Sequence, residues 1–178
     1  GDNLWRYDSP SVSGAQFSIA YQSANGTGHI SSYSDMGISI APEMVEGFSM
    51  GYAVGEYTET AAIGDIDVST LWVKYAYGPV TVSVSNNEYD DGTASSDQET
   101  SSYAITYTVT DDLSLTYGQD TIEKESDADD AEYSVIKAAY TSGGMTITAT
   151  MKDAENINHT TGTDEDVEYW SLGASFAF

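Results

Sequence analysis

Residues 145–152 read Met-Thr-Ile-Thr-Ala-Thr-Met-Lys, so an apolar side chain alternates with a polar one at every step. Successive side chains of a β-strand point to opposite faces, and a period of two therefore places the apolar groups on one face and the hydroxyls on the other. Residues 80–85 and 103–109 repeat this pattern. The segment predicts a β-sheet with one apolar and one hydroxyl-rich face.

The same alternation, weaker in places, recurs along all 178 residues and predicts an all-β chain of about eleven strands with no helix. No apolar run approaches the roughly 18 residues of a membrane-spanning helix. Nothing in the composition marks a second domain, so residues 1–178 are expected to form a single one. The expected strands are residues 3–9, 15–22, 34–40, 48–58, 67–77, 80–89, 100–109, 113–122, 132–140, 145–153 and 167–178.

The connections alternate in length. Short turns at 77–79, 110–112 and 141–144 are interleaved with longer acidic segments. Outer-membrane barrels have tight periplasmic turns and long extracellular loops, whereas a soluble β-sandwich gives no reason for every second loop to carry charge. The pattern predicts a transmembrane antiparallel up-and-down β-barrel whose apolar face is almost free of charge. The expected long loops are residues 23–33, 59–66, 90–99, 123–131 and 154–166.

Aromatic residues support this interpretation. The last strand places bulky groups on one face and ends on Phe178. Tyrosine and tryptophan near strand ends are typical of the aromatic girdles that meet lipid headgroups. The girdle candidates are Tyr21, Tyr57, Tyr77, Tyr89, Tyr117, Tyr140 and Trp170.

Charge and cysteine content exclude several classes of protein. Lys and Arg total 5 against 29 Asp and Glu, a formal charge of -24, which repels nucleic acid. With no Cys there is no disulfide framework and no thiolate metal site. No nucleophile-elbow, phosphate-cradling or zinc-binding pattern occurs, and His29 and His159 lie in predicted loops. The chain is therefore not expected to be an enzyme, although a hydrolase using a serine with His159 is an open alternative.

Two segments are specific enough to suggest a family. Residues 3–14, Asn-Leu-Trp-Arg-Tyr-Asp-Ser-Pro-Ser-Val-Ser-Gly, are followed by Phe-Ser-Ile-Ala-Tyr at 17–21. This stretch resembles the strand pair that follows the constriction loop in the general porins of Gram-negative bacteria. The strand ending on Phe178 resembles the assembly signal of the same family. The residues of this signal are Trp170, Leu172, Phe176 and Phe178.

The resemblance implies a homotrimeric sixteen-stranded barrel in the outer membrane, in contact with lipid and lipopolysaccharide, through which small hydrophilic solutes diffuse passively. If residues 3–9 are the sixth strand, eleven strands complete the barrel, and the chain is incomplete at its N-terminus. Single-chain bacterial barrels have even strand numbers, so an odd count independently indicates a missing part or a miscounted strand.

The polar face of the strands supplies the candidate pore-lining residues. Lys137 lies in a segment whose two faces are mixed, but a lysine facing lipid at midplane would cost about 2–4 kcal/mol, so it is expected to face inward. The resemblance further implies that Arg6 faces acidic residues of a constriction loop and helps to create a transverse field. The candidates are Arg6, Asp8, Asp35, Lys74, Asp120, Lys137 and Lys152.

The acidic loops suggest two further hypotheses. Asp127, Asp129 and Asp130 offer the oxygen ligands that Ca²⁺ or Mg²⁺ prefers, but no cluster has the spacing of an EF-hand, so at most loose binding is expected and no cofactor is needed. A negative vestibule concentrates cations, which predicts a mild cation preference. Two other functions stay open: a non-conducting barrel acting as an adhesin or surface anchor, and a secreted all-β module that binds Ca²⁺ or carbohydrate.

Overall fold

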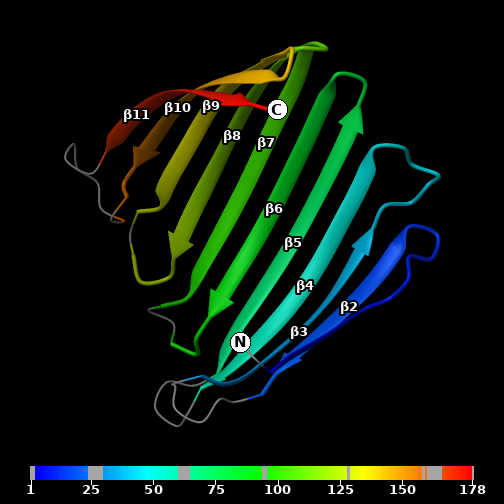
Figure 1. The fold of residues 1–178 in the computed structure, drawn as a ribbon. Helices are drawn as coiled ribbons and strands as arrows, with labels where there is room; N and C mark the ends of the chain where they lie inside the picture. Colours follow the sequence, from blue (N-terminus) through cyan, green and yellow to red (C-terminus); the bar gives the residue numbers. More distant parts are fainter. Residues whose placement is uncertain are drawn as a thin grey trace.

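The computed structural model describes residues 3–23, 30–59, 65–93, 96–127, 129–157, 159 and 166–177. These residues form one antiparallel sheet of eleven strands in which each strand pairs with its neighbours in chain order (Figure 1). No helix long and apolar enough to cross a membrane occurs in this part of the chain. The strands are β1 (Leu4–Asp8), β2 (Ala15–Gln22), β3 (Ile30–Ile40), β4 (Phe48–Glu59), β5 (Ile66–Tyr77), β6 (Val80–Asp90), β7 (Gln98–Thr110), β8 (Leu113–Lys124), β9 (Ala131–Ser142), β10 (Met145–Glu155) and β11 (Val167–Phe176).

The eleven predicted strands are confirmed, and all but one agree with the structure to within two residues at each end. The exception is β3, which begins at Ile30, so the predicted loop at 23–33 is too long. Residues 30–33 read Ile-Ser-Ser-Tyr and do not alternate. The end of β4 nevertheless pairs with them, and a β-bulge between Ile30 and Ser32 accommodates the irregular step.

The short and long connections lie at opposite ends of the strands, as expected for an up-and-down arrangement. Gly143 and Gly144, with φ of 57° and 82°, form a two-residue turn that needs positive φ at both positions. Gly47 has φ of 78°, and a Cβ there would lie 2.0 Å from the carbonyl oxygen of Ala76. The connection before β4 therefore packs against β5 at a point where only glycine fits.

Each strand contributes to two different faces of the sheet. Residues directly opposite each other on neighbouring strands point to the same side, so a series of them, here called a register row, identifies a face. One row runs through Val82, Ile105, Tyr117, Ile136, Met151 and Trp170, and we call its side the apolar face. The adjacent row runs through Thr81, Thr106, Thr116, Lys137, Thr150 and Ser171, and we call its side the polar face.

Large side chains of the apolar face are exposed. Trp170, Leu172 and Phe176 have exposed fractions of 73%, 69% and 60%. Among the described residues, only Ala20 and Ala131 are buried hydrophobic side chains, so the sheet encloses no apolar core. A continuous exposed apolar surface of this kind requires contact with a non-aqueous phase or with another protein surface.

Candidate pore wall

The polar face is built from small side chains. One register row across it consists of serine, alanine, glycine and valine between two lysines, and the next is mainly threonine. The hydroxyls of Thr106 and Thr116 are 2.9 Å apart, and those of Thr141 and Thr146 are 3.0 Å apart. Such a surface is hydrogen-bonded along the sheet and leaves space in front of it, as a wall in contact with water requires.

The structure brings all seven predicted pore-lining residues to this face. Lys137 lies directly opposite Thr116 and Thr150, which places it on the polar side. Pairing with neighbouring strands likewise assigns the other six to the same side. The seven are Arg6, Asp8, Asp35, Lys74, Asp120, Lys137 and Lys152.

Lys124 joins this set and was missed by the sequence reasoning. The predicted strand ended at 122, which placed Lys124 in a loop, whereas β8 extends to Lys124 and pairs it with Gln98. If the alternation had been continued two residues past Ile122, it would have placed Lys124 on the same face as Asp120. All 5 Lys and Arg residues of the chain therefore lie on the polar face. Among the strand residues whose side chains the structure describes, the carboxylates beside them are Asp8, Asp35 and Asp120, so these eight residues carry a net charge of +2 in a chain of -24.

Arg6 is paired within its own strand. Its Nε lies 2.9 Å from Oδ2 of Asp8, and its Nη2 lies 2.9 Å from Oδ1 of the same carboxylate. Both side chains are exposed, at 60% and 44%. The carboxylate compensates much of the charge of Arg6 locally. A role for Arg6 opposite a constriction loop stays a prediction.

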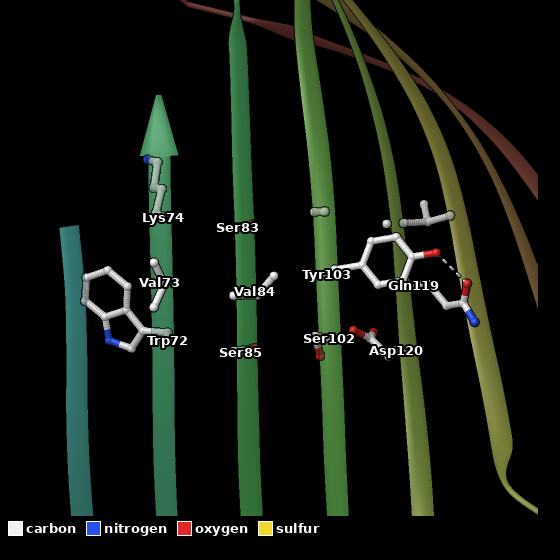
Figure 2. A pocket seen from close by; sticks show the side chains of 13 residues that line it. Trp72, Val73, Lys74, Ser83, Val84, Ser85, Ser102, Tyr103, Gln119 and Asp120 are labelled. Carbon is white, nitrogen blue, oxygen red and sulfur yellow. Dashed lines mark hydrogen bonds between the residues drawn. The ribbon is translucent and has the colours of Figure 1, made fainter. Parts of the chain in front are cut away.

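A hollow of about 330 Å³ lies over β5–β9 near the middle of the wall (Figure 2). Lys74 and Asp120 lie on its rim, and Ser83, Ser85 and Ser102 lie between them. Trp72 also lines the hollow from β5. This tryptophan was not among the predicted site residues, although it is in phase with Lys74 two residues later.

The apolar face changes character toward the long connections, and the prediction that it is almost free of charge is wrong there. Glu88, Glu99 and Glu123 lie opposite one another in one register row of this face, and Asp153 lies opposite Glu168. The strands continue two or three residues past the apolar belt into the acidic stretches, so carboxylates end up on strands. This face of the sheet is therefore apolar nearer the short turns and acidic nearer the long loops.

The long connections themselves gather more carboxylates. A hollow of about 510 Å³ is lined by eight acidic side chains, Asp127 and Asp130 among them. Within the described residues no group of three or more His, Cys, Asp or Glu side chains is arranged to hold a metal ion. Loose binding of Ca²⁺ or Mg²⁺ by Asp127, Asp129 and Asp130 stays a prediction.

Asp97 is the carboxylate of this edge whose surroundings are least like water. Its Oδ1 is inaccessible and accepts no hydrogen bond from the described residues. Burial, followed by the nearby charge of Asp90, raises the pKa of the Asp97 carboxyl. Protonation of this edge is therefore easier at Asp97 than at an ordinary surface carboxylate.

Of the two histidines, His159 lies within the described residues. The Nδ1 of His159 lies 3.2 Å from the backbone oxygen of Asp129, and the side chain is buried. His29 lies outside the described residues.

The bulky side chains of the terminal strand lie on the side of the sheet opposite the polar face. Trp170, Leu172 and Phe176 lie on the apolar face, opposite Met151, Ala149 and Met145. Phe178 lies outside the described residues, and the role of this strand as an assembly signal stays a prediction.

Of the girdle candidates, Tyr21, Tyr77, Tyr117, Tyr140 and Trp170 lie on the apolar face. Tyr57 and Tyr89 lie on the polar face, so they cannot meet lipid headgroups there. Tyr57 instead packs on Tyr33, with ring centroids 4.5 Å apart. The sequence reasoning used nearness to a strand end. It did not check the parity of these two positions, that is, on which face of the sheet their place in the alternation puts them.

Comparison with known proteins agrees with this geometry. A porin structure refined at 1.8 Å resolution aligns with a TM-score of 0.74 at 14% identity, over 98% of this chain and 60% of that one. OmpT, an outer membrane protein of Vibrio cholerae, aligns with a TM-score of 0.70 at 16% identity, over 97% of this chain and 63% of its own. An anion-selective porin from Comamonas acidovorans aligns with a TM-score of 0.67 at 14% identity, over 86% of this chain and 48% of its own.

The chain thus spans less than two thirds of the length of these structural relatives. None of the curated protein sequences matches it. The family model for the Gram-negative porins matches residues 2–178. The sheet with one exposed apolar face, the small-residue polar wall and this match lead to one conclusion: the chain belongs to the Gram-negative porin family and is an outer-membrane β-barrel protein.

Proposed function

We propose that this chain forms part of the wall of a water-filled channel through which small hydrophilic solutes and ions diffuse passively across the outer membrane. The observation that supports the proposal most strongly is the polar face, where serine, threonine, alanine and glycine dominate and all 5 cationic side chains gather. A non-conducting anchor has no need for a hydrated wall of small residues, and the described residues offer no catalytic group that would support an enzyme. A channel that is not an enzyme fits these features best.

The ion preference of the channel depends on two zones of opposite charge. The acidic loops attract cations, which is the basis of the mild cation preference inferred from the total charge of -24. The eight charged residues described on the polar face of the strands, at +2, act in the opposite sense. Screening limits each zone to about 8–10 Å at ordinary ionic strength, so the narrower zone decides the sign.

The assembly that best fits the family is a homotrimer embedded in outer-membrane lipid and lipopolysaccharide, with a sixteen-stranded barrel in each subunit. The apolar belt around Ile105, Leu115 and Ile147 provides the surface that such an environment requires. No cofactor is needed for diffusion. Divalent cations at the acidic loops would be loosely held counter-ions.

Planar-bilayer recording of the full-length protein, extracted from its native membrane in mild detergent and not heated, tests this proposal. Open-channel current in steps that close in threes would support both the channel and the trimer. A reversal potential in a salt gradient would then give the sign of selectivity. Folded protein that inserts but passes no current would refute the channel and favour the adhesin or anchor.

A further inference from the structure

Trp72 is a large aromatic side chain on a face that is otherwise built mainly of small polar ones. Across β4–β8 its register row on the polar face runs through Gly51, Trp72, Ser85, Ser102 and Asp120, in which it is by far the largest side chain, and in β9 the row continues to Tyr133, four strands away. Its indole reaches from β5 over β4 (Figure 2). Because the polar face is the water side of the sheet, a partly exposed indole there needs a reason other than contact with lipid.

Gly51 provides the place on which the indole rests. A Cβ at position 51 would lie 2.5 Å from Nε1 of Trp72 and 2.7 Å from its Cε2. The φ of Gly51 does not require glycine, since it is absent from the positive-φ positions of the described residues. The glycine thus serves to let the ring lie close to the wall.

The groups beside the indole suit a polyhydroxylated ring with an acid group. Ser83 and Ser85 lie opposite Lys74 and Trp72 on the neighbouring strand β6 and offer hydroxyls to the hollow (Figure 2). Lys74 is two residues from Trp72 on the same strand and face, about 7 Å away, and forms no ion pair within the described residues. Its ammonium group is therefore available to an anionic solute.

We propose that Trp72, Lys74 and the two serines opposite them on β6, Ser83 and Ser85, form a binding subsite for a sugar acid on the channel wall. The apolar side of the sugar ring stacks on the indole, the carboxylate pairs with Lys74, and the ring hydroxyls bond to Ser83 and Ser85 on the neighbouring strand. This subsite deepens the proposed channel function and rests on it. Asp120 neither contacts such a solute nor repels its acid group strongly, because three strand spacings, about 14 Å, separate it from the strand of Trp72, which exceeds the screening length.

The test uses glucuronate as the probe and the full-length protein in two formats. Calorimetric titration in detergent measures binding without requiring conduction, and bilayer recording measures interruptions of the ionic current by the same probe. We expect glucuronate to bind about tenfold more tightly than glucose, which corresponds to about 1.4 kcal/mol. Glucuronate should also interrupt the current for longer than glucose does.

Matched variants separate the subsite from general effects of charge and ring size. Lys74→Gln should lower glucuronate affinity about five- to tenfold, as expected for loss of a hydrogen bond to a charged group, whereas Lys152→Gln, in the same register row on β10, should change it less than about twofold. Trp72→Leu should weaken glucuronate and glucose alike, whereas Trp5→Leu on the apolar face should not. Gly51→Ala should reproduce the effect of Trp72→Leu because it displaces the ring.

Each result supports or overturns the subsite. Equal affinity of the wild type and Trp72→Leu, or equal losses in Lys74→Gln and Lys152→Gln, would overturn it. Benzoate binding as tightly as glucuronate would overturn the choice of a sugar ring. Normal conduction without glucuronate binding would refute the subsite and leave the channel intact, whereas binding without any conduction would refute the channel and keep the subsite.

Discussion

Ile105 and Thr106 are adjacent in β7, yet they belong to two surfaces with opposite requirements. Ile105 is 45% exposed and lies in a register row of bulky apolar side chains, whereas Thr106 shares a hydrogen bond with Thr116 on the other side. The comparison between the apolar and polar faces extends over the whole sheet. In this protein the environment of a side chain depends on whether its position in the strand alternation faces one side of the sheet or the other, because the sheet is one layer thick and has no interior.

The separation of charge follows the same parity. The 5 cationic residues all lie on the polar face, whereas the strand carboxylates nearest the long loops, such as Glu99 and Glu123, lie on the apolar side. The protein therefore offers a weakly positive wall inside a strongly negative rim. The total charge of -24 reflects the carboxylates of the rim and does not indicate the sign of the charge on the wall.

The largest expected effect comes from placing the same charge on either face of β7. Ile105→Lys should cost about 2–4 kcal/mol of unfolding free energy, because it exposes an ammonium group to lipid, and Ala104→Lys should cost less than about 1 kcal/mol. Denaturant unfolding in phospholipid vesicles measures both. Equal losses would show that the apolar face does not contact lipid.

The contribution of a hydrogen bond to the free energy of unfolding should also differ between the two faces. Tyr103 and Tyr117 donate their hydroxyls to Oε1 of Gln119, at 2.8 Å and 3.2 Å, at the edge of the apolar belt nearer the long loops. Gln119→Leu should cost about 1–3 kcal/mol, because two phenols lose their acceptor. Thr106→Val should cost about 0.5 kcal/mol, since Thr116 can bond to water in its place. The same unfolding assay would contradict this comparison if Thr106→Val proved the more damaging of the two.

Among strand residues, removal of a single charge should change ion selectivity only from the polar face. Lys137→Gln lowers the net charge of the eight described wall residues from +2 to +1 and should shift the reversal potential toward cations. Glu99→Gln, on the opposite face, should leave it almost unchanged, because the sheet and about 8–10 Å of screening separate it from the wall. A larger shift from Glu99→Gln would place the selective zone outside the strands.

The smallest expected effect lies where both faces end at the acidic loops. The pKa of Asp97 is raised in the folded protein, so the folded state retains the proton more strongly than the unfolded state does. Local stability should therefore be highest at low pH and fall as pH rises from the usual carboxyl range through the raised folded pKa.

Exchange of the amide of Glu125, which donates to the backbone oxygen of Asp97 at 3.2 Å, reports on this edge. Its protection should decline with rising pH in the wild type and stay level in Asp97→Asn. A decline of the same size in both proteins would rule out the carboxyl as the cause.

Much of the fold could be predicted because alternation is a local property of the chain. Residues 145–152 by themselves indicate a strand, and they also indicate which side chains share a face. Errors occurred where the alternation is weak or was not followed to its end. The start of β3 at Ile30 was missed among polar residues, and Lys124 was assigned to a loop because charge was taken as a sign of one.

The candidate site was predictable only in part. Alternation was enough to assign both charged residues of the hollow to the polar face, because Lys74 lies between Val73 and Tyr75, and Asp120 is out of phase with Leu115 and Tyr117 earlier in its strand. It could not indicate that Trp72 belongs to the same hollow, since a tryptophan in a membrane strand is expected at the lipid surface. Its position depends on Gly51, which is 21 positions earlier in the chain and lies opposite it in β4.

The sequence by itself thus determined the strands and the two faces, because a period of two acts through the geometry of consecutive residues. Only the tertiary structure decided which residues become lateral neighbours. Register depends on turn geometry and on hydrogen bonds between strands, and a shift by two residues preserves every face while changing every neighbour. The pairing of Trp72 with Gly51, and the alignment of Lys74 and Lys152 in one row, therefore had to be found in the folded sheet.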